Sequence, residues 1–119
     1  MPQSHILLVE DEPGTRDLYA YVLREAGYTV TAVANAAEAI DSLASHQFDL
    51  LLSDYSLPDM TGVDLIEQVR DAAPRMRILL MSCHPQIEQL ATNARVDGWF
   101  VKSPIIPDLL AVVQRLLTA

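Results

Sequence analysis

Short runs of apolar residues alternate with longer segments of mixed polarity along the chain. The longer segments repeat apolar residues every three to four positions, as amphipathic helices do, and the short runs have the length of buried strands. Strands that alternate with helices in this way are typical of a parallel sheet with crossover helices on both faces. We therefore predict an α/β fold, a doubly wound parallel sheet whose five strands cover 6–9, 29–33, 50–53, 78–81 and 99–101.

Residues that start or stop helices lie between these strands. The five predicted helices begin at Pro13, after Asn35, at Thr61 or Gly62, at Pro85 and at Pro107. In the first helix we expect Leu18, Val22 and Ala26 to share the face that contacts the sheet. The strand 29–33 alternates threonine with valine or alanine, which favours a half-exposed strand at an edge of the sheet.

Polar or charged residues follow four of the five predicted strands. Glu10 and Asp11 follow the first strand, Asp54 the third, Ser82 the fourth and Lys102 the fifth. Each of them alone fits a turn or a solvated surface position. Because the carboxyl ends of parallel strands meet at one edge of the sheet, where ligands bind, we expect these side chains to converge on one site.

The expected cluster has the groups that phosphoryl transfer needs. Carboxylates held close together raise one another's pKa unless a cation is bound, and a set of oxygen ligands beside an open crevice suits Mg²⁺. Lys102 and Ser82 would donate hydrogen bonds to phosphoryl oxygens. Asp54, central in the sheet, would be the nucleophile that forms an aspartyl phosphate.

Composition narrows the function further. A net charge of −8 and a pI near 4.6 disfavour direct binding to nucleic acid. No apolar run is long enough for a signal peptide or a membrane span. The single cysteine favours a cytoplasmic location, and the three scattered histidines lack the spacing of zinc ligands.

The chain resembles the receiver domain of bacterial two-component response regulators, with the fold of the chemotaxis regulators. The segments that carry the resemblance are 9–12, 53–62, 81–82 and Lys102. The resemblance covers essentially all 119 residues, so we expect a single receiver domain over 1–119, either free-standing or the N-terminal part of a longer regulator. It also implies the flavodoxin-like strand order 2-1-3-4-5.

The resemblance implies a role for each residue of the cluster. Asp54 would accept a phosphoryl group from a histidine kinase or a phosphotransfer protein. Asp11 and Asp54, with the backbone carbonyl of Ser56, would bind Mg²⁺, and Glu10 would act mainly through water. Such a protein is not a conventional enzyme, although it catalyses its own phosphorylation and dephosphorylation.

The resemblance also implies a switch. Ser82 and Lys102 would bind the phosphoryl group, and Ser82 would move toward it. Trp99 matches the aromatic residue that changes rotamer, so that the surface of helix four, strand five and helix five alters its affinity for a downstream output domain or protein. Ser56 and His84 occupy positions that influence the lifetime of the phosphate.

Two departures from the family pattern leave an alternative open. Ser103 follows Lys102 where the family usually has proline, and Arg95-Val96 replaces a usual Gly-Ala pair. The alternative is a degenerate receiver that acts as a binding module without phosphorylation. A magnesium-dependent phosphohydrolase is disfavoured, because Ser56 stands where that class commonly has a second acid. The apolar pair Ile105-Ile106 leaves a phosphorylation-dependent homodimer open.

Overall fold

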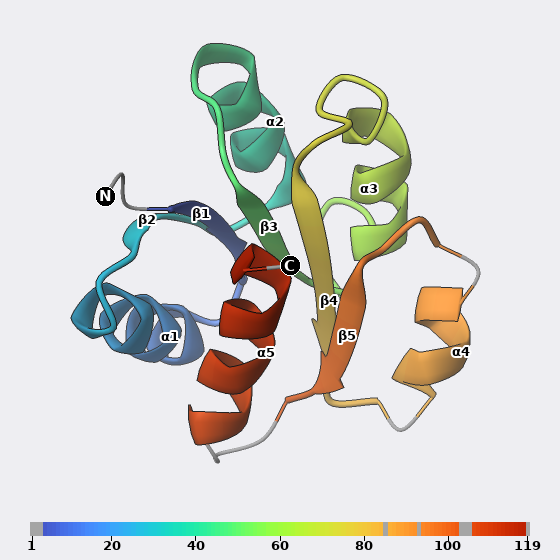
Figure 1. The fold of residues 1–119 in the computed structure, drawn as a ribbon. Helices are drawn as coiled ribbons and strands as arrows, with labels where there is room; N and C mark the ends of the chain where they lie inside the picture. Colours follow the sequence, from blue (N-terminus) through green and yellow to red (C-terminus); the bar gives the residue numbers. More distant parts are fainter. Residues whose placement is uncertain (1–3, 85, 93, 103–105, 119) are drawn as a thin grey trace.

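The computed structural model describes residues 4–84, 86–92, 94–102 and 106–118. Within them the chain forms a five-stranded parallel sheet in the order β2-β1-β3-β4-β5, which confirms the predicted fold class and strand order (Figure 1). In chain order the elements are β1 (His5–Val9), α1 (Pro13–Glu25), β2 (Thr29–Val33), α2 (Ala36–Ser45), β3 (Leu50–Asp54), α3 (Gly62–Val69), β4 (Arg77–Ser82), α4 (Ile87–Thr92), β5 (Gly98–Val101) and α5 (Ile106–Thr118).

Helices cover both faces of the sheet, so the central strands are apolar on both sides. Alternate residues of a strand point to opposite faces. In β1, for example, Leu7 and Val9 pack with α2, α3 and α4, while Ile6 and Leu8 pack with α1 and α5. Figure 1 shows α1 and α5 together on one side of the sheet. The apolar runs of the sequence are thus explained by burial on two faces.

The prediction of which face of α1 contacts the sheet was wrong. Leu18 is 47% exposed and Ala26 lies exposed beyond the helix, whereas Tyr19, Ala20 and Leu23 are buried. Two apolar stripes with helical spacing compete on this helix, and the one with Tyr19 and Leu23 joins the core with α5. The spacing of apolar residues identifies the candidate faces of a helix, but contacts with the sheet determine which of these faces is buried.

Helices α1, α2 and α3 begin at Pro13, Ala36 and Gly62, as predicted. Helix α5 begins at Ile106, one residue before the expected Pro107, and α4 is a short helix over Ile87–Thr92. The expected start of α4 at Pro85 lies outside the described residues, as do Ser103 and Ile105. In the described part of the chain, no helix has both the length and the apolar character needed to cross a membrane.

Candidate functional site

The predicted site residues lie at the carboxyl edge of the sheet. Asp54 and Ser82 end β3 and β4, and Glu10 and Lys102 follow β1 and β5 directly. Backbone hydrogen bonds fix two of these ends: the Glu10 N–H donates to the Val33 carbonyl (3.1 Å) and the Lys102 N–H donates to the Ser82 carbonyl (2.8 Å). The register of the sheet therefore places side chains that are far apart in sequence at one edge.

Lys102 joins the two buried carboxylates of the site. Its ammonium lies 2.9 and 3.0 Å from the two carboxylate oxygens of Glu10 and 2.7 Å from Oδ2 of Asp54. Glu10 is completely buried, Asp54 is 6% exposed, and the Lys102 side chain is 13% exposed. Such short ion pairs in a site with little solvent are stronger than pairs on the surface.

A single ammonium cannot neutralise both carboxylates, and the protonation equilibria reflect this. Burial, together with the neighbouring Asp54, raises the pKa of Glu10 from 4.5 to about 7. Burial opposes the charge of Lys102, but its hydrogen bonds to Asp54 and Glu10 outweigh that effect and raise the pKa of Lys102 above its ordinary value. The site therefore has too little positive charge at neutral pH to balance its carboxylates, and a bound cation would supply the rest.

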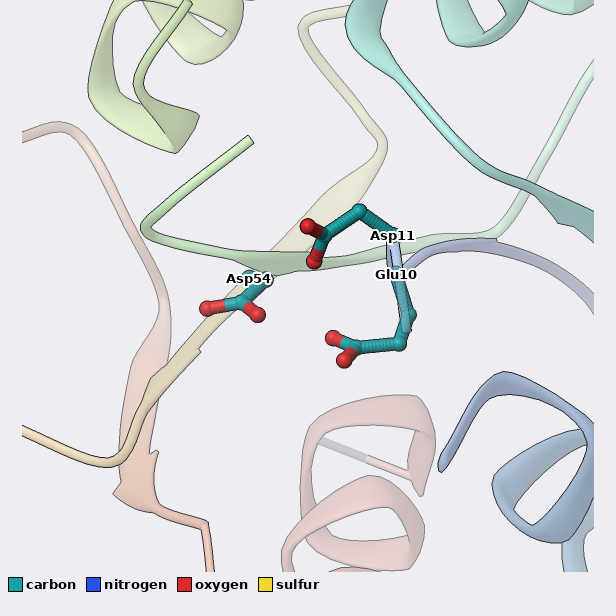
Figure 2. Close-up of side chains that lie close together, drawn as sticks. All are labelled: Glu10, Asp11 and Asp54. Carbon is teal, nitrogen blue, oxygen red and sulfur yellow. The ribbon is translucent and has the colours of Figure 1, made fainter. Parts of the chain in front are cut away.

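Three carboxylates could hold such a cation. Glu10, Asp11 and Asp54 each offer an oxygen, and these oxygens lie within 4.8 Å of one another; Figure 2 shows the carboxylates around one shared space. Asp11 is exposed, whereas Lys102 already contacts both oxygens of Glu10. An oxygen-only donor set with an exposed side fits a hard divalent cation that keeps several waters. Asp11 is its freest ligand, because each oxygen of Asp54 already accepts a hydrogen bond, from Lys102 or from the Ser56 N–H.

Three further predicted residues lie at this edge of the sheet: Ser82 at the end of β4, and Ser56 and His84 in the loops that follow β3 and β4. The Ser56 N–H donates to Asp54 Oδ1 (3.3 Å), and the Ser56 side chain is exposed. Ser82 is buried, and its hydroxyl accepts a hydrogen bond from the His84 N–H (3.0 Å). Nδ1 of His84 accepts from the Gln86 N–H (3.3 Å), so in this state the imidazole is engaged in its own turn.

Trp99 lies apart from this cluster. It is paired with Leu80 across β4 and β5, is 38% exposed, and lines a pocket of about 600 Å³ with residues of α4 and α5. The indole is therefore accessible on the face where the predicted output surface lies.

Three contacts of the site were not predicted. Gly62 lies so close to β3 that an added Cβ would overlap the Asp54 carbonyl oxygen. Asp59 accepts hydrogen bonds from the N–H groups of Ala36 (3.0 Å) and Ala37 (2.9 Å), which lower the pKa of its carboxyl and tie the loop after β3 to α2. Arg16 donates from Nη1 to the Glu10 carbonyl (3.0 Å). A sequence pattern gives little sign of such contacts between elements.

Comparisons with known proteins agree with this geometry. The model of the response regulator receiver domain family matches residues 6–114. The alginate biosynthesis transcriptional regulatory protein AlgB of Pseudomonas putida is 36% identical over 119 residues, which cover 98% of this chain and 25% of AlgB. A 14.6 kDa protein of Leptolyngbya boryana is 42% identical over 124 residues, which cover 100% of this chain and 94% of that protein.

A solved structure of similar fold comes from Thermotoga maritima. Its response regulator TrrA, in complex with Mg²⁺-BeF, superimposes with a TM-score of 0.90 at 28% identity, covering 97% of this chain and 100% of that chain. The fold, the acidic cluster and the family match define a receiver domain of two-component systems. The chain belongs to the response regulator receiver domain family, and it spans about a quarter of the length of AlgB.

Proposed function

We propose that Asp54 is the phosphoacceptor of this receiver domain. One oxygen of its carboxylate attacks the phosphorus of a phosphohistidine on a histidine kinase or a phosphotransfer protein. The P–O bond forms as the P–N bond breaks, and the imidazole of the donor keeps the electron pair. The observation that carries the proposal is the contact of a nearly buried Asp54 carboxylate with Lys102, at the carboxyl edge of a parallel sheet.

The neighbouring residues divide the remaining work. Lys102 neutralises phosphoryl charge, and the Ser82 hydroxyl, which now accepts from His84, turns to donate to a phosphoryl oxygen. Asp11, Asp54 and the Ser56 carbonyl bind Mg²⁺, with Glu10 acting through water. When bound, the ion neutralises negative charge on the oxygens of the transferred group.

Phosphorylation of Asp54 would change partner binding by changing the contacts of Lys102 and Ser82. A phosphoryl dianion on Asp54 competes for Lys102 and Ser82, which end the adjacent strands β5 and β4. Their shift, reported by Trp99, changes the affinity of the α4-β5-α5 face for an output domain or protein. We further propose that residues 1–119 form one receiver domain that acts in the cytoplasm. Ser56 and His84 would set water access to the phosphate and hence its lifetime.

One incubation tests this function. With acetyl phosphate and Mg²⁺, intact mass spectrometry should show one added phosphoryl group on the parent and none on Asp54→Asn. A protein that never gains the group acts as a binding module only. Steady release of inorganic phosphate at enzymatic rates, without accumulation of the phosphoprotein, would instead indicate a phosphohydrolase. No contact in the described residues favours either of these alternatives over a receiver.

A further inference from the structure

Arg16 makes one specific contact with the site from outside the acidic cluster. The residue is half-buried in the first turn of α1, and its Nη1 donates to the backbone carbonyl of Glu10 at 3.0 Å. A cation is electrostatically unfavourable in the first turn of a helix, because that end of the helix already has a partial positive charge. A residue that is unfavourable for its own helix but lies next to a site is a candidate for a role in that site.

The hydrogen bond holds the peptide group that connects Glu10 to Asp11. The Glu10 N–H is fixed by the Val33 carbonyl of β2, and Arg16 fixes the Glu10 carbonyl. On the far side, the Glu12 carboxylate accepts from the N–H groups of Gly14 and Thr15 and caps α1. The backbone on both sides of Asp11 is therefore anchored.

The Asp11 side chain lacks such support. It is exposed, and within the described residues its carboxylate has no hydrogen-bond or ion-pair partner. The position of its oxygens beside Asp54 therefore depends on the direction of the backbone from which the side chain extends. Arg16 is one of the groups that fix that direction, since its Nη1 donates to the carbonyl of the peptide directly before Asp11.

We propose that Arg16 is a positioning residue for the divalent cation site, acting through the Glu10–Asp11 peptide. The inference rests on the proposed metal-binding function of Asp11 and Asp54. Groups that orient metal ligands commonly change metal affinity by about 10-fold to 100-fold when they are removed. We expect Arg16→Ala to weaken binding of a divalent cation by about tenfold, the lower end of that range.

The sign of the effect separates positioning from electrostatics. Arg16 is a cation near three carboxylates, so removal of its charge alone would strengthen the binding of another cation. Loss of the hydrogen bond to the Glu10 carbonyl would weaken binding instead. Arg16→Lys keeps a charged donor and should recover most of the affinity, whereas Arg16→Ala should not.

The chain offers a matched control in the same helix. Arg24 donates from Nη2 to the carbonyl of Val30 at 2.9 Å, again six residues away, but at the opposite end of α1. Arg24→Ala removes a similar side chain and a similar bond without touching the acidic cluster. It should lower stability at least as much as Arg16→Ala, because a cation is favoured in the last turn of a helix, yet leave the affinity for the cation unchanged.

The experiment is a titration of Mn²⁺ monitored by the electron paramagnetic resonance signal of the free ion, followed by displacement with Mg²⁺. It uses the parent, Arg16→Ala, Arg16→Lys and Arg24→Ala, each verified as folded by circular dichroism. Weaker binding in Arg16→Ala alone, with recovery in Arg16→Lys, supports the proposal. Equal or tighter binding in Arg16→Ala overturns it while leaving the metal site intact, and equal weakening in Arg24→Ala also overturns it. A parent that binds no Mn²⁺ refutes both the metal site and the role of Arg16.

Discussion

The Lys102 ammonium contacts both carboxylate oxygens of Glu10, at 2.9 and 3.0 Å, although 92 positions separate the two residues. The same ammonium contacts Asp54 at 2.7 Å. This interaction links the ends of β1, β3 and β5, so it supports the fold as well as the chemistry of the site.

Replacement of Lys102 by methionine should destabilise the protein. It leaves Glu10 and Asp54 as buried carboxylates without a counter-charge, which costs about 3 kcal/mol of unfolding free energy at pH 8. At pH 5 the cost should be smaller, because protonation removes the charge of Glu10. Urea denaturation of both proteins in EDTA at the two pH values measures the difference, and an equal loss at both would contradict the explanation.

The raised pKa of Glu10 predicts a pH dependence of stability. The folded state binds the Glu10 proton more tightly than the unfolded state, so the stabilisation from this group is complete below about pH 4.5 and is lost as the pH rises through about 7. The loss is on the order of 3 kcal/mol. Glu10→Gln cannot ionise, so its unfolding free energy in EDTA should fall less between pH 5 and pH 8, as urea denaturation would show. Parallel pH profiles for the two proteins would refute this assignment.

The close approach of Gly62 to β3 predicts a strong effect of one methyl group. In Gly62→Ala the new Cβ meets the Asp54 carbonyl, a backbone atom that side-chain rotation cannot move, so we expect a loss of about 2–3 kcal/mol. Gly14→Ala is the control, because its Cβ meets only the Glu12 side chain, whose carboxylate lies at 3.2 and 3.3 Å and needs to shift by only a few tenths of an ångström. Its stability should stay within about 1 kcal/mol of the parent. Chemical denaturation of the parent and both variants measures the unfolding free energies. Similar losses in Gly62→Ala and Gly14→Ala would contradict the predicted overlap with the Asp54 carbonyl.

Trp99 offers an optical test of the proposed switch. Because the indole is 38% exposed beside the pocket between α4 and α5, a shift of β5 should change its fluorescence. Beryllofluoride with Mg²⁺ should produce this change in the parent, and Ser82→Ala should reduce it. Asp54→Asn, which lacks the nucleophile, should show no change. An identical response in the parent and in Ser82→Ala would remove Ser82 from the switch.

The sequence pattern predicted the doubly wound parallel sheet and the edge of the sheet on which the site lies, for a physical reason, whereas the strand order followed only from the resemblance to receiver domains. Strands buried on two faces appear as uninterrupted apolar runs. Four of these runs end at a polar or charged residue, namely Glu10, Asp54, Ser82 and Lys102. Both features are local in sequence. They needed no knowledge of long-range contacts beyond the rule that parallel strands end together.

Features that depend on packing between elements were not predictable in the same way. The buried stripe of α1 runs through Tyr19 and Leu23 because α5 covers it, which no pattern within the helix indicates. The contacts of Asp59 with α2 and of Arg16 with Glu10 join side chains to backbone groups of other segments. Neither residue type nor spacing specifies such a partner.

The identity of the phosphorylated residue is the central claim, and chemical mapping tests it most directly. After phosphorylation by acetyl phosphate and Mg²⁺, borohydride reduces an aspartyl phosphate to homoserine, which peptide mass spectrometry can locate. We predict homoserine at position 54 in the treated parent and nowhere in the untreated control. Homoserine at another aspartate, or a phosphoprotein that yields none, would contradict the assignment of Asp54.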